Sequence, residues 1–300
     1  MSGSKFKLSA KTVLILIIND YPKISIFENL SNYNLSTKMI FFNAAKYLKY
    51  ILLSHHREGH GIHSPFVFDL VSRVFRNKID LDIVCTIEKV RKKMISDRRS
   101  ILVKDLGSRS QLLKTNLRRV SDIARYSPVP GKYGELLSKM AAEFGKPLII
   151  EFGTSLGIST MYMAASCTDT TVYTIEGCPA TAEIARHNFT EAGLNNIKIF
   201  EGPFDEVLPG FANSGVKAGL VFIDGNHRKE PVIKYFNQMA ELSDDKTVII
   251  IDDINYSNEM TEAWNEIKLH EKVSLSVDIF RMGMIFFRQG INHNNYIIRY

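Results

Sequence analysis

The second half of the chain alternates short β-branched runs with helical stretches, and this order constrains the fold more than any other feature. The runs PLIIEFG, TVYTIEG, IKIFEG, GLVFIDG and TVIIIDD occur among segments whose apolar residues recur at helical spacing. Such β-α-β order predicts a mostly parallel, doubly wound sheet with right-handed crossovers. The last two runs, VSLSVDIF and GMIFFR, are joined only by Arg281 and Met282, so they must form an antiparallel hairpin. We therefore predict an α/β fold with a seven-stranded sheet whose last strand is antiparallel.

The first half of the chain has a different pattern. From residue 41 to about 125, four segments repeat apolar residues at spacings of three and four, and no strand signal interrupts them. One of these helices is expected to begin at Ser64-Pro65, an N-cap followed by proline at the first helical position. The predicted parts are a poorly ordered tail over residues 1–38, an α-helical cap over 39–130, the α/β domain over 131–290 and a C-terminal tail over 291–300.

Compartment signals are few. The run VLILII near the start follows lysines, but it is shorter than the apolar region of a signal peptide and no cleavage site follows it. Met39 directly precedes the first helical segment, so the sequence leaves open whether residues 1–38 belong to the native protein. No apolar run approaches the roughly 20 residues of a membrane span. Three cysteines lie far apart without a C-x-x-C pair, which favours a reducing compartment, and we expect a cytoplasmic protein.

The formal net charge of +6 is unevenly distributed. Between Lys89 and Arg125, twelve basic residues face only three aspartates. Such a surface can meet nucleic acid or an anionic substrate, and it can equally be the solvated face of amphipathic helices.

A glycine loop follows the first strand of the α/β half, in EFGTSLGIST (Glu151 to Thr160). Gly153 and Gly157 allow a sharp turn and a close approach to a ligand, and the next helix presents its free N–H groups there. Ser155 breaks the G-x-G-x-x-G fingerprint, which argues against a pyrophosphate. One strand later Glu176 ends VYTIEG, where a carboxylate can accept both hydroxyls of a ribose. The pattern predicts a nucleoside ligand without a pyrophosphate, and S-adenosylmethionine fits it.

Residues from about 130 to 290 resemble a class I S-adenosylmethionine-dependent methyltransferase of the catechol and caffeoyl-CoA O-methyltransferase type. EFGTSLGIST resembles the first motif of that family and VYTIEG the second, while VFIDGNH and IIIDDINYS match its two acidic segments. The terminal hairpin matches the family's seventh strand, inserted antiparallel beside the fifth. The helical part, with HGIHSPFVFDL, resembles the extension of an uncharacterised bacterial group of methyltransferases.

The resemblance implies roles for individual residues. The residues implied around the methionine moiety are Glu151, Gly153, Ser155, Gly157 and Ser159. Glu176 would hold the ribose, and the residues implied near the adenine are Gly202, Pro203 and Phe204. Phe204 has an equal alternative as a core residue. Asp224 is a further cofactor contact.

The resemblance also implies a cation site and a base. The metal ligands would be Asp224, Asp252 and Asp253, although the family usually has asparagine at the third position. Three carboxylates suit a hard divalent cation such as Mg²⁺. The alternative is that Asp224 contacts only the cofactor and that Asp252 or Asp253 caps the helix beginning near Asn258. His227, with Asp224, is the predicted catalytic pair, since an unperturbed histidine titrates near pH 6.5 and can take the acceptor's proton; it can also be an ordinary surface histidine.

Other readings remain open from the residues alone. The histidines of HHREGHGIH, namely His55, His56, His60 and His63, lack a zinc-ligand spacing and are expected in a loop that lines the acceptor pocket. Gly153 to Gly157 also satisfies G-x-S-x-G, so a serine hydrolase with Ser155, Asp252 and His270 is an alternative. The second alternative is a nucleic-acid methyltransferase that uses the basic cap. The third is a protein that binds the cofactor without catalysis. We favour methylation of a hydroxyl on a small molecule; a homodimer is plausible, and the acceptor's identity is not encoded in any readable motif.

Overall fold

The computed structural model describes residues 46–54, 62–104, 116–213, 215, 217–291 and 293–300. Its centre is an eight-stranded sheet in the order β10-β8-β9-β7-β6-β3-β4-β5. The strands are β3 (Leu148–Phe152), β4 (Thr171–Glu176), β5 (Ile197–Glu201), β6 (Leu220–Ile223), β7 (Val248–Ile251), β8 (Leu275–Asp278), β9 (Gly283–Phe286) and β10 (Asn294–Ile297). The first five are parallel, and β9 lies between β7 and β8, antiparallel to both. The predicted doubly wound sheet and its inserted hairpin are confirmed.

The sheet has one strand more than the sequence predicts. Residues Asn294–Ile297, which were expected in a tail, form β10 and pair parallel with β8. The hydroxyl of Tyr50 donates to the carbonyl oxygen of Ile298 at 2.7 Å, so the end of the chain is fixed to the helix over residues 46–53.

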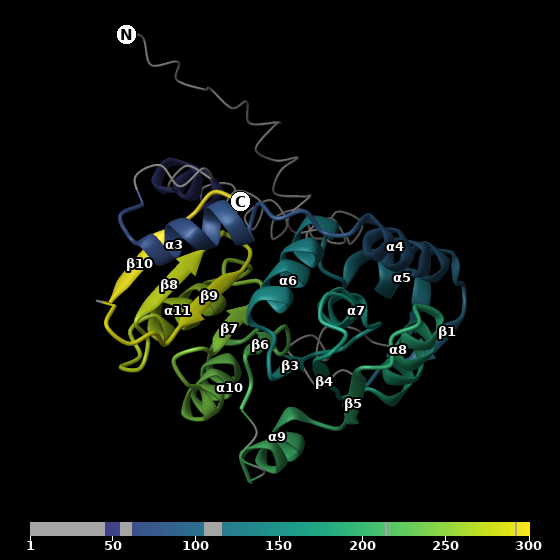
Figure 1. The fold of residues 1–300 in the computed structure, drawn as a ribbon. Helices are drawn as coiled ribbons and strands as arrows, with labels where there is room; N and C mark the ends of the chain where they lie inside the picture. The colour runs from purple at the N-terminus through teal and green to yellow at the C-terminus, as the bar shows by residue number, and fades with distance from the viewer. Residues whose placement is uncertain (1–45, 55–61, 105–115, 214, 216, 292) are drawn as a thin grey trace.

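Helices cover both faces of the sheet (Figure 1). They are α6 (Gly131–Phe144), α7 (Ile158–Ala165), α8 (Pro179–Glu191), α9 (Phe204–Asn213), α10 (Lys229–Leu242) and α11 (Asn258–Ile267). Side chains of a strand point alternately to its two faces, so Ile149 and Phe222 pack in the cluster that contains α6, whereas Ile150 and Ile223 pack in the cluster that contains α10 and α11. Central strands buried on both faces explain the continuous apolar runs in the sequence.

The cap consists mainly of helices, as predicted. Its described elements are a helix over residues 46–53, α3 (Pro65–Asp69), a π-helical turn η2 (Leu70–Val74), α4 (Leu81–Ser96) and α5 (Val120–Tyr126). The hydroxyl of Ser64 accepts from the amide of Val67, which confirms the predicted N-cap. The cap also contains a short antiparallel pair, β1 (Ser100–Leu102) and β2 (Leu117–Arg119), in a region predicted as helix throughout. None of the helices among the described residues is long and apolar enough to cross a membrane.

Helices α4 and α5 pack against the part of the α/β domain that follows the glycine loop. Ile87 and Val90 of α4 share one apolar cluster with Leu156 of the loop and with Met161 of α7. The cap therefore supports the loop and its helix from outside. The predicted tail over residues 1–38 and the histidines at 55, 56 and 60 lie outside the described residues.

Candidate cofactor and acceptor site

The glycine loop joins β3 to α7 through three residues with positive φ. They are Gly153 at +99°, Ser155 at +49° and Gly157 at +87°. A Cβ on Gly153 would lie 2.4 Å from the carbonyl oxygen of Asp224, and one on Gly157 would lie 2.3 Å from the Phe189 ring. Only glycine fits these two places, so the loop passes directly against the end of β6.

We expect Gly153→Ala to destabilise the protein by about 2–5 kcal/mol, because the substitution combines a disfavoured φ with a backbone clash. Gly193→Ala is a matched control, since Gly193 also has a positive φ of +71° but would place its Cβ in open space. Its expected cost is about 1 kcal/mol. Urea unfolding of both variants would measure the difference, and equal losses would show that the contact with β6 is unimportant.

Glu176 ends β4 and holds the glycine loop. Its Oε2 accepts from the amide of Ser155 at 2.7 Å, and its Oε1 accepts from the amide of Cys178 at 2.9 Å. Burial raises the pKa of this carboxyl, while the backbone hydrogen bonds act in the opposite direction. Each oxygen of a carboxylate can accept more than one hydrogen bond, so Glu176 can also accept from a bound hydroxyl.

Glu151 does not line the space that Glu176 faces, but lies buried behind the glycine loop. It is fully buried and accepts hydrogen bonds from Ser159 at 2.6 Å, from Thr174 at 2.7 Å and from Thr160. Burial raises its pKa to about 7, although these three hydroxyl donors lower it. This network joins β3 to the first turn of α7 and to β4. Glu151 therefore lies behind the loop and fixes it.

The burial of Glu151 makes the stability of the protein depend on pH. Glu151 ionises at its ordinary value of 4.5 in the unfolded chain and near 7 in the fold. The folded state thus binds more protons between these values, and the free energy of unfolding falls as pH rises through the window, by up to about 3 kcal/mol. Glu151→Gln removes this titration. The free energy of unfolding of the variant minus that of wild type should therefore rise by about 2 kcal/mol from pH 5 to pH 8. Urea unfolding at several pH values tests this; parallel curves for both proteins would contradict it.

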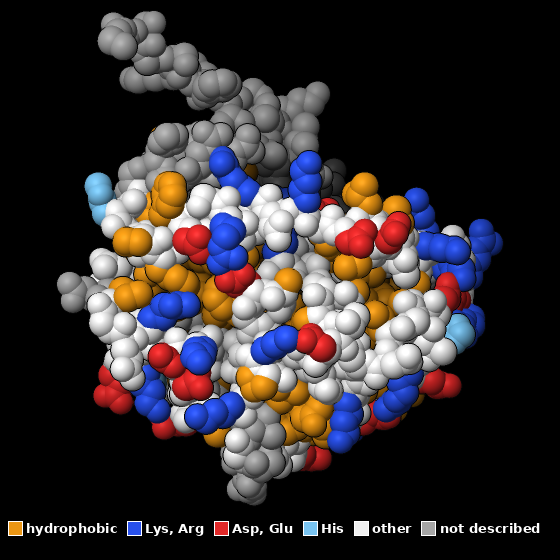
Figure 2. All heavy atoms as spheres, in the orientation of Figure 1, with side chains coloured by type: hydrophobic (Ala, Val, Ile, Leu, Met, Phe, Trp, Pro, Cys, Tyr) orange, Lys and Arg blue, Asp and Glu red, His pale blue; other side chains and the backbone are white. Residues whose placement is uncertain are grey.

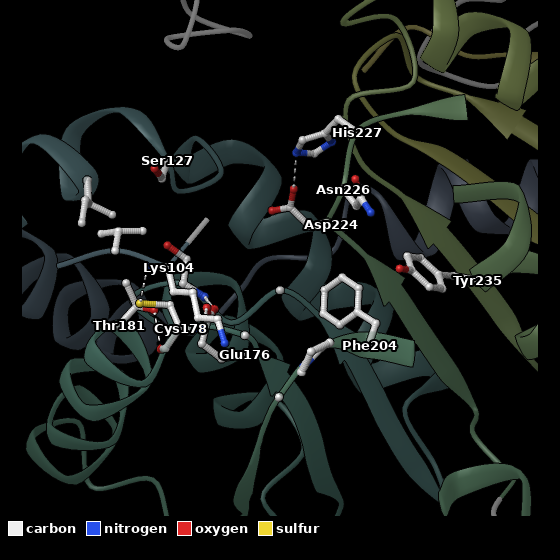
Figure 3. A pocket seen from close by; sticks show the side chains of 18 of the residues that line it. Lys104, Ser127, Glu176, Cys178, Thr181, Phe204, Asp224, Asn226, His227 and Tyr235 are labelled. Atoms are coloured by element: carbon white, nitrogen blue, oxygen red, sulfur yellow. Dashed lines mark hydrogen bonds and ion pairs between the residues drawn. The ribbon is translucent and has the colours of Figure 1, made fainter. Parts of the chain in front are cut away.

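The loop, the strand ends and the cap enclose a cavity of about 460 Å³ (Figure 3). Eight of its lining residues were predicted from the sequence: Gly153, Ser155, Glu176, Gly202, Pro203, Phe204, Asp224 and His227. Figure 3 shows Glu176, Cys178 and Lys104 on one side of this space, with Asp224 and His227 on the other. The predicted residues Glu151, Gly157, Ser159, Asp252 and Asp253 do not line it.

Several lining residues were missed. The cap contributes Val103, Lys104, Arg118, Ile123 and Ser127, and the α/β domain adds Gly177, Cys178, Thr181, Asp205, Gly225, Asn226 and Tyr235. Asn226 lies in the polar end of VFIDGNH and could have been included from that signal. The cap residues could not, because the β1–β2 pair that carries Lys104 and Arg118 to the cavity has no strand pattern in the sequence.

Phe204 has the core role considered for it, and its contact with adenine stays a prediction. Its ring packs edge-on against Phe152 and Tyr235, at centroid distances of 5.4 and 5.3 Å. A Cβ on Gly225 would lie 2.6 Å from the same ring. The ring thus belongs to an aromatic cluster and also forms part of the cavity wall.

His227 lies between two carboxylates. Its Nε2 is 3.5 Å from Oδ1 of Asp224 and 3.8 Å from Oδ2 of Asp253. One potential metal-ligand atom from each of Asp224, His227 and Asp253 lies within 4.8 Å of the other two. This trio was only partly predicted as a cluster, because the sequence grouped the two aspartates with Asp252.

Asp252 is paired with an arginine instead. Nε of Arg281 donates to its Oδ1 at 2.9 Å and a terminal nitrogen donates to Oδ2 at 2.6 Å, and both side chains are fully buried. The same nitrogen is 3.2 Å from Oδ1 of Asp253. The predicted three-carboxylate magnesium set would have to share Asp252 with a buried guanidinium, which binds both oxygens of that carboxylate. The capping alternative is wrong, since the hydroxyl of Ser257 caps α11.

The hydrolase alternative is not favoured by the geometry. Asp252 is bound by Arg281, and His270 packs edge-on against Phe236 at 5.4 Å. Nδ1 of His270 accepts from the amide of Lys272. The acid and the histidine of the proposed triad are therefore engaged elsewhere.

Comparison with known sequences supports a methyltransferase. Residues 150–254 match a family model described as a methyltransferase domain. Proteins named putative O-methyltransferase from Mycobacterium ulcerans and Mycobacterium marinum are each 32% identical over 127 residues, which cover 41% of this chain and 55% of theirs. The O-methyltransferase imqG of Aspergillus flavus is 28% identical over 155 residues, 49% of this chain and 60% of its own. The chain thus spans about half the length of the curated relatives it matches.

Solved structures share the fold. An O-methyltransferase from Bacillus cereus in complex with SAH is 23% identical, covers 74% of this chain and 97% of its own, and has a TM-score of 0.50. The O-methyltransferase TomG from Streptomyces achromogenes, in complex with SAM, is 17% identical, covers 74% and 96%, and has the same TM-score. Residues 150–254 are therefore similar to methyltransferase domains, and the chain shares the fold of the O-methyltransferases of known structure.

Proposed function

We propose that this protein is an S-adenosylmethionine-dependent methyltransferase that methylates a hydroxyl group of a small molecule. The observation that carries the proposal is the cavity in which Glu176, held beside the glycine loop, faces Asp224 and His227, which follow β6. The named relatives are O-methyltransferases, and two structural neighbours contain SAH or SAM. A cavity of about 460 Å³ also suits a compact ligand.

The cavity residues suggest how the cofactor would lie. Glu176 would accept the ribose hydroxyls, Gly153 and Ser155 would contact the methionine part, and Asp224 would face its amino group. The residues near the adenine would be Gly202, Pro203 and Phe204. Glu151, Gly157 and Ser159 would act indirectly, because they shape the loop from behind.

His227 is the proposed catalytic base. When bound, S-adenosylmethionine supplies a methyl group that an acceptor oxygen takes by in-line displacement, while the sulfur keeps the electron pair. His227 would receive the hydroxyl proton, and the carboxylates of Asp224 and Asp253 would stabilise the imidazolium that results. A divalent cation has no part in this mechanism, because Asp252 of the predicted ligand set is paired with Arg281.

The basic cap supports a nucleic-acid substrate less well. Figure 2 shows Lys and Arg side chains gathered at one edge, over α4 and α5, among acidic ones. Lys93 pairs with Glu191 and Arg99 with Asp97, so part of this charge is neutralised within the protein. Exposed ion pairs of this kind are typical of solvated helix faces. A homodimer and a cytoplasmic location stay predictions.

The first test is calorimetric titration of the protein with S-adenosylmethionine, followed by an assay for SAH release with a panel of hydroxylated aromatic and aliphatic compounds. Saturable binding and acceptor-dependent SAH release are expected. A protein that binds no S-adenosylmethionine would refute the proposal. Release of SAH with RNA but with no small hydroxyl compound would support the nucleic-acid alternative instead.

A further inference from the structure

We propose that Arg281 is a positioning residue whose guanidinium supplies the fixed positive charge at the end of β7, so that methyl transfer by this protein needs no divalent cation. The inference rests on the proposed function. It starts from the mismatch between the predicted metal ligands and their observed partners.

The contacts of Arg281 leave Asp252 unsuited to a cation. The guanidinium binds both carboxylate oxygens, at 2.9 and 2.6 Å, and neither side chain is exposed to solvent. Charged two-point contacts of this kind are short and directional. A buried charge is stable only with a partner, so a cation at Asp252 would compete with a buried guanidinium for the same two oxygens.

The backbone around Arg281 fixes its position. Its carbonyl oxygen accepts from the amide of Ile254, at 3.0 Å, and the side-chain amide of Asn255 donates to the carbonyl oxygen of Phe280, at 2.8 Å. The β8–β9 turn is thereby tied to the loop that follows β7. The guanidinium also lies 5.6 Å from the centroid of the Tyr133 ring. The backbone of Arg281 is therefore fixed beside the end of β7, and its guanidinium packs near Tyr133.

Asp253 connects Arg281 to the cavity. One of its oxygens is 3.2 Å from the guanidinium and the other is 3.8 Å from Nε2 of His227. A divalent ion held by Asp224, His227 and Asp253 would share the Asp253 carboxylate with the guanidinium, and like charges this close repel. Asp253 instead lies between the guanidinium of Arg281 and the imidazole of His227, so its carboxylate can stabilise His227 when that residue acts as the base.

The wild-type protein provides the first experiment. Mn²⁺ is titrated into the protein, with and without S-adenosylmethionine, and free Mn²⁺ is followed by electron paramagnetic resonance. We expect no saturable binding, and the same rate of methyl transfer in EDTA as in Mg²⁺. Stoichiometric Mn²⁺ binding that Asp253→Asn abolishes, or activity lost in EDTA and restored by Mg²⁺, would overturn the proposal. The Mn²⁺ titration needs no turnover, so it is decided separately from the methyltransferase assignment, which fails if S-adenosylmethionine does not bind.

Three variants test the role of Arg281 itself. Arg281→Lys keeps a positive charge and should retain activity that is indifferent to EDTA. Arg281→Gln with Asp252→Asn removes both charges, which preserves a neutral core, and should lower the transfer rate about 10- to 100-fold with the affinity for S-adenosylmethionine unchanged. Arg281→Gln alone releases Asp252 and should gain Mn²⁺ binding. A neutral double variant that is as active as wild type would overturn the positioning role, even if the single variant does not fold.

Discussion

Replacing Glu176 with alanine is expected to weaken S-adenosylmethionine binding by at least about 100-fold, because hydrogen bonds to a charged carboxylate contribute roughly 1.5–3 kcal/mol each. The substitution removes the acceptor proposed for the ribose. It also releases the amide of Ser155, which Glu176 holds at 2.7 Å, so the glycine loop loses its anchor. Isothermal titration calorimetry of the variant would measure the change in affinity directly.

Glu201→Ala is the matched control for this result. Glu201 ends β5 directly beside Glu176, in register with it, but it pairs with Arg186 and does not line the cavity. Its removal should leave the affinity for S-adenosylmethionine unchanged. Circular dichroism would show that both variants keep their fold. If Glu176→Ala binds the cofactor as well as Glu201→Ala does, the nucleoside lies elsewhere and the proposed orientation is wrong.

His227→Ala is expected to lower kcat for a hydroxyl acceptor by about 100- to 1,000-fold, the range over which a positioned base contributes. Affinity for S-adenosylmethionine should change little, because the imidazole is proposed to meet the acceptor and not the cofactor. Initial rates of SAH release, measured with the acceptor that the panel identifies, would give kcat, and calorimetry would give the affinity.

The control for this effect is His270→Ala. His270 packs against Phe236 and is not among the residues that line the cavity, so its loss should leave kcat near the wild-type value. A His227→Ala enzyme with unchanged kcat would mean that alignment of the acceptor suffices and that no base is needed. An equal loss in both variants would point to a general effect on the fold.

The strand ends of the α/β domain could be predicted because their physical signature is local. Strands β6 and β7 are buried on both faces, so each is read as a continuous apolar run. Asp224 follows the apolar run of β6 and Glu176 ends β4, and such polar residues must gather at the carboxyl edge of a parallel sheet. The glycine loop is equally local, since Gly153 and Gly157 have backbone conformations that other residues rarely adopt.

The partners of Asp252 and the walls of the cavity could not be predicted in this way. Arg281 lies in a turn between two strands, where a basic residue usually faces solvent, and only the inserted hairpin brings it to a strand end 29 residues earlier. In the cap, β1 and β2 are three residues each, with Leu102 and Leu117 largely exposed. Three residues are too few for an alternating pattern to be recognised in the sequence, so nothing there indicated that Lys104 and Arg118 face the site.

The strand β10 also could not be predicted, because its pairing is not encoded in its own residues. The strand β10 has the sequence NNYI, which is half polar and lies at the edge of the sheet. Its pairing with β8 depends on backbone hydrogen bonds and on Tyr50, far away in the sequence, and not on an apolar pattern of its own. Local patterns predict what a strand buries, and they do not predict which edge accepts another strand.

The ion pair between Asp252 and Arg281 also orders events during synthesis. Asp252 leaves the ribosome before its partner, and until Arg281 follows, the end of β7 carries a carboxylate that has no counter-charge in the core. Burial of an unpaired charge is strongly unfavourable. We therefore expect the β8–β9 hairpin to insert late in folding, because it both covers the end of β7 and delivers the guanidinium that pairs with Asp252.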